Sequence, residues 1–410
     1  MKPLLSVLLA VALCAILFAQ RRGGGGPVNL PEGNGKATVE AACVDCHALN
    51  QVVNAGHDRQ EWQTVVDMMI NDGAKVPPDQ VATMVDYLAK NFPEKPVPSA
   101  VIMPGSVKVN IKEWTVPTPG SRPHDPLYTP DDSLWYTGQM ANVIGRLDLK
   151  TGKFTEYHIK TPGSGPHGLT VDKEGNIWFT ANFKTYIGKL YTKTGEFQEY
   201  KIPAEARDPH TPIFDQKGTL WFTVQGANML GRLNPQTGEV KVVTSPTPRS
   251  NPYGMVVDSK GNPYFVEFGS NKVARVDPNT MEIHEFVLPD PAARPRRVAI
   301  TPEDIIWYSD YARGYLGRLD PATGKVTEWP SPGGPRSQPY GITIVKGAVW
   351  YSESNTKPNT LVRFDPNTEK FQTWPIPSGG GVVRNMMTTK DNNIVMACSG
   401  VNKVALAEIQ

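Results

Sequence analysis

Cys43, Cys46 and His47 form a C-x-x-C-H run that places two thiols and an imidazole within about one helical turn. This spacing allows a haem to be attached through two thioether bonds, with His47 as an axial ligand of the iron. A thioredoxin-like site would need a βαβ setting, and a structural zinc would need a second ligand pair. The remaining cysteines are Cys14 and Cys398. We therefore expect covalent haem c at Cys43 and Cys46.

A second iron ligand is expected on the far side of this motif in the sequence. A methionine thioether is the usual partner of histidine in electron-transfer haems, and it raises their reduction potential. Met68 and Met69 come shortly before Gly73, a predicted helix end, so their side chains can point back toward a haem. Met84 and His57 are alternatives, as is an open site, although Met84 fits core packing and His57 fits a surface loop.

Three helices are expected around the motif, at 37–47, 61–71 and 78–91. A unit this small buries little core by itself, and a haem would add apolar mass. A set of residues in it resembles short class I cytochrome c domains fused to other periplasmic modules: Trp62, Val66, Met69, Gly73, Ala74 and Tyr87-Leu88-Ala89. The resemblance implies electron transfer and assigns the axial methionine to Met69, four residues before Gly73.

The N-terminus has the pattern of a secretory signal. Lys2 precedes an apolar run from Leu4 to Ala19, which is shorter than the ~20 residues that a membrane-spanning helix needs. We expect cleavage after Ala19, export to a bacterial periplasm and no stable membrane span. Arg21 and Arg22 leave an uncleaved anchor as the alternative. The net charge of +2 argues against a nucleic-acid partner.

The rest of the chain repeats with a period of about 43 residues. An aromatic pair recurs at each step, and Val395-Met396 takes the seventh place: Trp135-Tyr136, Trp178-Phe179, Trp221-Phe222, Tyr264-Phe265, Trp307-Tyr308 and Trp350-Tyr351. Repeats of 40 to 50 residues with four short strands each are typical of a β-propeller. We expect seven blades, with a strand at 109–116 completing the last one and so removing two open sheet edges.

Aligning the blades predicts what lines the central channel. One residue stands eleven positions before each aromatic pair, or ten in the sixth blade: His124, His167, His210, Tyr253, Arg296, Tyr340 and Arg384. We call these seven the ring, and expect it to bind an anion or a metal at one channel mouth. Turn chemistry around a solvated funnel is the alternative. A second layer, three residues after each pair, carries Glu267, Asp310 and Glu353 in blades 4 to 6.

The repeat motifs P-H-G-[LI]-T-x-D-x-x-G-x-[IL]-W-F-T and I-G-[RK]-L-x-x-x-T-G resemble the virginiamycin B lyase family over nearly all of 108–410. That family opens a cyclic depsipeptide ester by elimination, using Mg²⁺ held by histidines and carboxylates. The resemblance implies His167, His210 and Asp208 as candidate catalytic and metal residues. Val224 stands where a further metal carboxylate belongs, which predicts weak Mg²⁺ binding and no lyase activity.

The expected fold is therefore a small all-α cytochrome c domain followed by an all-β seven-bladed β-propeller. The segments are a signal peptide (1–19), a flexible Gly-rich leader (20–34), the cytochrome c domain (35–93), a Pro-rich linker (94–105) and the propeller (106–410). We expect an electron-transfer protein whose propeller binds a redox partner protein or a small anionic substrate. A lyase with an accessory haem domain and a haem-based redox sensor are the alternatives.

Overall fold

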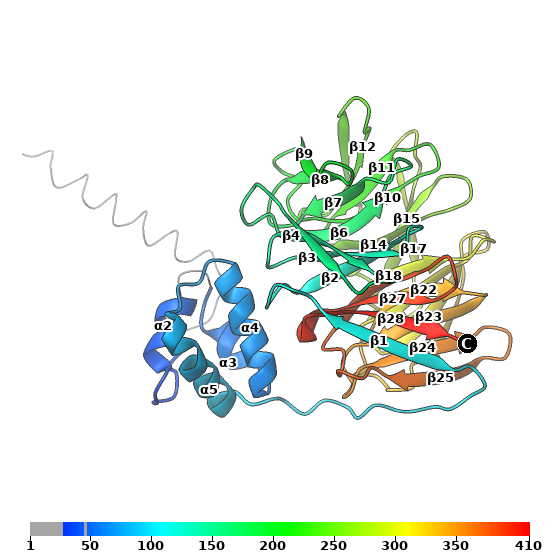
Figure 1. Cartoon of the computed structure of the whole chain (residues 1–410). Coiled ribbons are helices and arrows are strands. Elements are labelled where there is room, and N and C mark those ends of the chain that lie inside the picture. Colours follow the sequence, from blue (N-terminus) through cyan, green and yellow to red (C-terminus); the bar gives the residue numbers. More distant parts are fainter. Residues whose placement is uncertain (1–27, 45–46) are drawn as a thin grey trace, which may run out of the picture. The chain divides into compact units, whose positions relative to one another are not determined.

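The computed structural model describes residues 28–44 and 47–410, which form two compact units that divide between Pro96 and Val97 (Figure 1). The predicted signal peptide, the first part of the leader and Cys46 lie outside the described residues. Within the described part of the chain, no helix is long and apolar enough to cross a membrane.

The first unit is helical. It contains α2 (Lys36–Cys43), α3 (Asn50–Asn54), α4 (Arg59–Asn71), the 3₁₀ turn η1 (Pro78–Gln80) and α5 (Val81–Asn91). The first predicted helix, 37–47, ends earlier, at Cys43, and α3 was not predicted. Five residues are too few to show a helical hydrophobic repeat, so the short α3 leaves no clear signal in the sequence.

Helix α4 has well-defined ends. Asp58 accepts a hydrogen bond from the Glu61 amide at 2.9 Å, and the Asp58 amide donates to the Glu61 carboxylate at 3.1 Å, which is a capping box. At the other end Gly73 adopts φ 105°, and the Ala74 amide donates to the Met69 carbonyl at 2.9 Å. The helix buries Trp62 and Val66 against the apolar face of α5, and these ends fix the position of Met69.

The second unit is a propeller of seven four-stranded antiparallel sheets (Figure 1). Blade 1 holds β2 (Pro123–Thr129), β3 (Ser133–Gly138), β4 (Val143–Asp148) and β5 (Phe154–His158); blade 2 holds β6 (Pro166–Val171), β7 (Ile177–Ala181), β8 (Tyr186–Tyr191) and β9 (Glu196–Lys201); blade 3 holds β10 (Pro209–Phe214), β11 (Leu220–Val224), β12 (Met229–Leu233) and β13 (Val240–Thr244). Blade 4 holds β14 (Pro252–Val257), β15 (Pro263–Glu267), β16 (Lys272–Val276) and β17 (Ile283–Val287); blade 5 holds β18 (Pro295–Ile300), β19 (Ile306–Asp310), β20 (Tyr315–Asp320) and β21 (Lys325–Pro330). Blade 6 holds β22 (Pro339–Val345), β23 (Ala348–Glu353), β24 (Thr360–Asp365) and β25 (Lys370–Pro375); blade 7 holds β26 (Val383–Thr388), β27 (Ile394–Cys398), β28 (Lys403–Ile409) and β1 (Val109–Thr115), with the 3₁₀ turn η2 (Ser399–Val401) between β27 and β28.

The ring of blades is closed by strand β1. Its residues pair antiparallel with β28 from Val109 opposite Ile409 to Thr115 opposite Lys403. The predicted closure of the last blade by an N-terminal strand is confirmed. Because β1 is 280 residues or more away from β28 in the chain, this pairing ties both ends of the propeller together.

A glycine on the third strand explains the I-G-[RK]-L motif. Gly231 lies opposite Phe222, and a Cβ at Gly231 would lie 2.1 Å from the ring of Phe222. The same relation holds for Gly188 under Phe179. The motif therefore records the packing of the aromatic pair against the neighbouring strand.

Part of the predicted linker lies on the propeller. The Lys357 amide donates to the Pro98 carbonyl at 2.9 Å, and the Thr373 amide donates to the Met103 carbonyl at 3.0 Å. Residues after Val97 thus belong to the second unit, and the covered edge strand β25 loses part of its open edge.

Candidate functional site

Every member of the ring occupies the second position of the first strand in its blade, at β2, β6, β10, β14, β18, β22 and β26. In each blade the pairing register shifts at this point, which is a β-bulge. A bulge turns a side chain away from the regular alternation of a strand. The structure brings these side chains together at the channel, as described below.

Hydroxyl groups of the W-F-T motif hold the ring strands in place. Thr137 donates to the His167 carbonyl at 2.8 Å and accepts from the Asp125 amide at 3.1 Å. Thr180 makes the equivalent bond to the His210 carbonyl at 2.6 Å. Each hydroxyl links its own blade to the next one, so the motif fixes neighbouring ring residues relative to each other.

The three ring histidines lie side by side with their imidazole planes tilted relative to each other. The ring centroids of His124 and His167 are 3.7 Å apart, and those of His167 and His210 are 3.8 Å apart. All three are at most 4% exposed. Burial holds the pKa of each imidazole well below its ordinary value, and nearby arginines, among them Arg297, lower it further. The histidines are therefore neutral, and His167 Nδ1 has no hydrogen-bond partner.

Two tyrosines and an arginine continue the ring. The Tyr253 ring lies 3.9 Å from that of His210, and the phenol groups of Tyr253 and Tyr340 hydrogen-bond to each other. The Arg296 guanidinium lies 3.9 Å from the centroid of the Tyr340 ring. Burial raises the pKa of Tyr340, but Arg296 and other arginines outweigh burial, so the net shift is downward. The field at this mouth is strongly positive.

Two charged residues next to the ring were not predicted. Asp125 and Arg297 each follow a ring position, and they form an ion pair at 2.6 Å. Asp125 also lies 2.9 Å from His124 Nδ1 and accepts from Asn385 at 3.1 Å. Because both partners are at most 4% exposed, the pair is nearly dry. The alignment contained the signal, since the residues one place after the ring are also equivalent.

Arg122 is a third addition, and it lies just before β2. Its main electrostatic neighbour is Arg384: the repulsion between them lowers the pKa of Arg122 to about 9, and burial and Arg296 contribute. The Arg122 amide donates to Asn402 at 3.3 Å, and its φ of 54° is left-handed. Asp208, Asn251 and Gln338 stand at the equivalent position in their blades and are also left-handed, so this conformation belongs to the repeat.

Asp208 lies apart from the predicted metal set. Its carboxylate accepts from the Asn182 amide group, and burial raises its pKa to about 7. His210 Nδ1 instead lies 2.9 Å from the Thr211 hydroxyl. Among the described residues, the group of histidine and acidic side chains close enough to share a metal is His124, Asp125 and His167.

The residues present do not fit the Mg²⁺ that the family resemblance implies. Val224 is fully buried and packs with apolar residues such as Ile202 and Ala206. The carboxylate of Asp125, which is inside the candidate cluster, is already paired with Arg297. A hard divalent cation needs several oxygen ligands, and the surrounding arginines repel it.

The second-layer carboxylates of blades 4 to 6 are fully buried and hydrogen-bonded within the protein. Glu267 accepts from Ser245 at 2.8 Å and Ser270 at 2.6 Å. Glu353 accepts from Ser331 and from the Gly333 amide, both at 2.6 Å, and Asp310 pairs with Arg313 at 2.6 Å. Glu267 and Glu353 thus bind groups of the segments that connect the preceding blade to their own, and Asp310 binds a residue of the turn after its strand.

The helical unit contains a small, partly open cavity of about 40 Å³. Cys43 and His47 of the C-x-x-C-H run line this cavity, together with Met69 and Met84. The other lining residues are Ala42, Val66, Asp72, Ala74 and Val76. Met68 is not among these residues. His57 lies elsewhere, with its ring 4.9 Å from that of Trp62.

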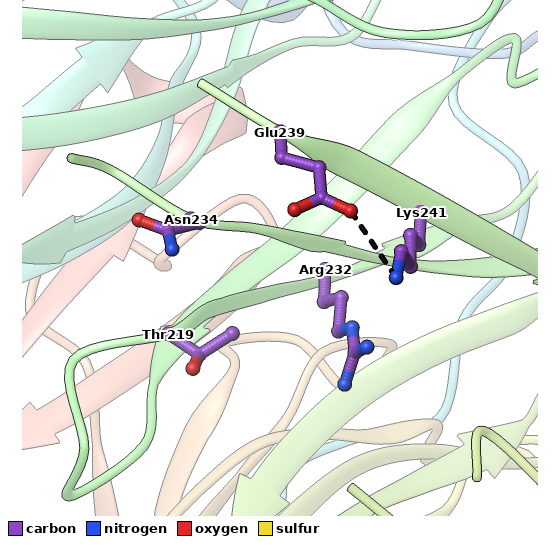
Figure 2. A pocket seen from close by; sticks show the side chains of 5 residues that line it. All are labelled: Thr219, Arg232, Asn234, Glu239 and Lys241. Atoms are coloured by element: carbon purple, nitrogen blue, oxygen red, sulfur yellow. Dashed lines mark ion pairs between the residues drawn. The ribbon is translucent and has the colours of Figure 1, made fainter. Parts of the chain in front are cut away.

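A further pocket in blade 3 is formed by residues in or beside β12 and β13 and by a residue of the turn between β10 and β11 (Figure 2). Its lining is polar: Thr219, Arg232, Asn234, Glu239 and Lys241. Glu239 and Lys241 form an ion pair at 3.1 Å, as Figure 2 shows. Both side chains are more than half exposed, so this pair contributes little energy and the pocket resembles ordinary surface.

The fold and the ring define a seven-bladed propeller with a polar channel mouth. The chain belongs to the virginiamycin B lyase family, whose model matches residues 102–357. A streptogramin B lyase structure is 26% identical, with a TM-score of 0.68, over 74% of this chain and 98% of that one. No curated protein matches the chain.

Two structures of virginiamycin B lyase from Staphylococcus aureus are also similar. One is 24% identical, with a TM-score of 0.67, over 73% of this chain and 99% of that one. The other is a catalytically inactive histidine-to-alanine variant with quinupristin, 25% identical, with a TM-score of 0.66, over 73% of this chain and 99% of that one. These matches concern the propeller fold.

Proposed function

We propose that the chain is an exported c-type haem protein that transfers electrons, with a propeller that binds a redox partner or a small anionic substrate at the ring. The observation that carries the proposal is that Cys43, His47 and Met69 line one pocket of the helical unit. Export to the periplasm is part of the proposal, because c-type cytochromes receive their haem outside the cytoplasm.

The side-chain chemistry of the pocket lining suits a haem. Cys43 and Cys46 would hold it through thioethers, with His47 and Met69 on the iron. Apolar side chains such as Val66 and Val76 would keep water away from the edge of the haem. When bound, the haem supplies one-electron chemistry. The helix end at Gly73 holds Met69 at the pocket, and Met84 is the competing thioether.

The test is a pyridine-haem spectrum of the denatured full-length protein, in which we expect the c-type form. Haem that acid-acetone extracts would overturn the proposal. In the oxidised native protein, Met69→Ala is expected to remove the weak sulfur-to-iron absorption band. Met84→Ala is the matched control, since it lines the same pocket and is expected to leave the band in place. The opposite pattern would assign the ligand to Met84.

A lyase reaction is the second candidate, favoured by the family membership and by the contact between His167 and His210. Neutral imidazoles can accept a proton, as an elimination requires. The buried Val224 argues against the metal-dependent form. We therefore expect the natural protein not to open a streptogramin B depsipeptide in the presence of Mg²⁺.

A direct assay of ring opening tests this expectation, and Val224→Glu is the informative variant. We expect the variant to gain measurable Mg²⁺ binding and at most a trace of turnover. Efficient Mg²⁺-dependent opening by the natural protein, abolished by His210→Ala, would show that the family chemistry persists without a carboxylate at position 224.

A further inference from the structure

We propose that Arg122, Arg296 and Arg384 bind a small dianion at the ring, either a dicarboxylate or a phosphate. The inference rests on the part of the proposed function that places a ligand at the ring, and it is independent of the haem. It names the chemistry of that ligand and adds a residue, Arg122, which lies outside the ring.

The first observation is an excess of positive charge. Of the four arginines at this mouth, Arg297 is neutralised by Asp125 at 2.6 Å. Within the part of the chain that the structure describes, no carboxylate forms an ion pair with Arg122, Arg296 or Arg384. Arg384 repels Arg122 strongly enough to dominate the lowered pKa of Arg122. Half-buried like charges without a counter-ion are costly, and a bound anion would offset that cost.

The second observation is a set of unused donors. The Nε atoms of Arg296 and Arg384 are buried and have no hydrogen-bond partner. The face of Arg296 is covered, since its guanidinium lies 3.9 Å from the Tyr340 ring, 4.2 Å from Tyr311 and 4.6 Å from Phe268. Aromatic rings stabilise the cation through its face but do not accept its N–H groups. Apart from its interaction with the Tyr253 phenol, the edge of the guanidinium remains available to oxygen ligands.

The remaining ring residues suit the same ligand. His124, His167 and His210 are neutral and can donate a hydrogen bond without adding charge. The phenols of Tyr253 and Tyr340 add polar groups at the same place. Three unpaired guanidinium groups favour a ligand with at least two negative charges over a monoanion.

The experiment is calorimetric titration of the full-length protein with phosphate, succinate and acetate at constant ionic strength. We expect phosphate, succinate or both to bind, and acetate to bind at least tenfold more weakly. Tighter binding of phosphate would identify the ligand as a phosphate, and tighter binding of succinate would identify it as a dicarboxylate. Arg384→Gln is expected to weaken dianion binding at least tenfold. Arg275→Gln, an exposed arginine on the third strand of blade 4, is the control and is expected to bind as the parent does.

A thermal melt separates a binding role from a structural one. Without a dianion, Arg384→Gln is expected to raise Tm, because it relieves the repulsion of Arg122. With a dianion, Tm is expected to rise in the parent and not in the variant. Absence of dianion binding to the parent, or parent-like binding by Arg384→Gln, would overturn the inference. Arg122→Gln gives the same test if the first variant does not fold. A c-type haem spectrum that persists in every variant would show that failure of dianion binding does not affect the haem proposal.

Discussion

At the scale of single residues, the ring combines neutral bases with unpaired cations. Burial and the field of the arginines both hold the histidine pKa values down. The same field lowers the pKa of Tyr340 despite its burial. This environment stabilises anions and opposes divalent cations, so the site has the electrostatics of an anion site on the fold of the virginiamycin B lyase family.

Asp208 has a shift in the opposite direction from the ring histidines: burial raises the pKa of its carboxyl group from 3.8 to about 7. A carboxyl group with a raised pKa in the folded state binds its proton more tightly there than in the unfolded chain. Its contribution to stability is thus present below about pH 4 and is lost as the pH rises to about 7. The full shift corresponds to about 4 kcal/mol, and partial exposure of Asp208 reduces this to about 2 kcal/mol.

Asp208→Asn removes this titration and keeps the oxygen that accepts from Asn182. Asparagine also tolerates the left-handed φ of 66° at this position. We expect the variant to be more stable than the parent by about 2 kcal/mol at pH 8 and nearly equal to it at pH 4. Urea unfolding at the two pH values measures this. Asp391→Asn, on an exposed turn, is the control, and an equal gain in both variants would contradict the argument.

At the scale of elements, the residues of the repeat motif make contacts that connect neighbouring strands and neighbouring blades. The W-F-T hydroxyls join neighbouring blades, and the glycine of the third strand makes room for the aromatic ring of the second. The pairing of β1 with β28 is a further connection, and it is not part of the repeat motif. Closure of the propeller depends on this one strand pair.

Deleting residues 106–118 tests the closure. The deletion removes β1, leaves blade 7 one strand short and exposes the edge of β28. We expect aggregation or a broad, non-cooperative unfolding transition, because an open edge pairs with other chains. Circular dichroism melts and light scattering measure both outcomes. A single sharp transition at the parent temperature would show that the ring is stable without β1.

At the scale of the whole molecule, the chain separates two kinds of chemistry into two units. The helical unit gathers thiol, imidazole and thioether groups around one apolar pocket. The propeller gathers arginines at its channel mouth, although the net charge of the chain is only +2. Local charge, and not net charge, therefore sets what the propeller attracts.

The sequence by itself determined the features that repeat or that lie close together in the chain. The period of 43 residues predicted the propeller, its seven blades and the membership of the ring, because each blade is one copy of the same local packing. The C-x-x-C-H run predicted haem attachment, and the structure places Cys43, His47 and Met69 at one pocket; the haem itself stays a prediction.

Only the tertiary structure decided contacts that cross the channel. Asp125 and Arg297 are 172 residues apart, and their pairing requires blades 1 and 5 to face each other in a closed ring. The hydrogen-bond partners of Glu267 and Glu353 come from loops, which differ from blade to blade. A repeat records what the blades have in common, whereas the electrostatics of the channel arise from the residues in which the blades differ.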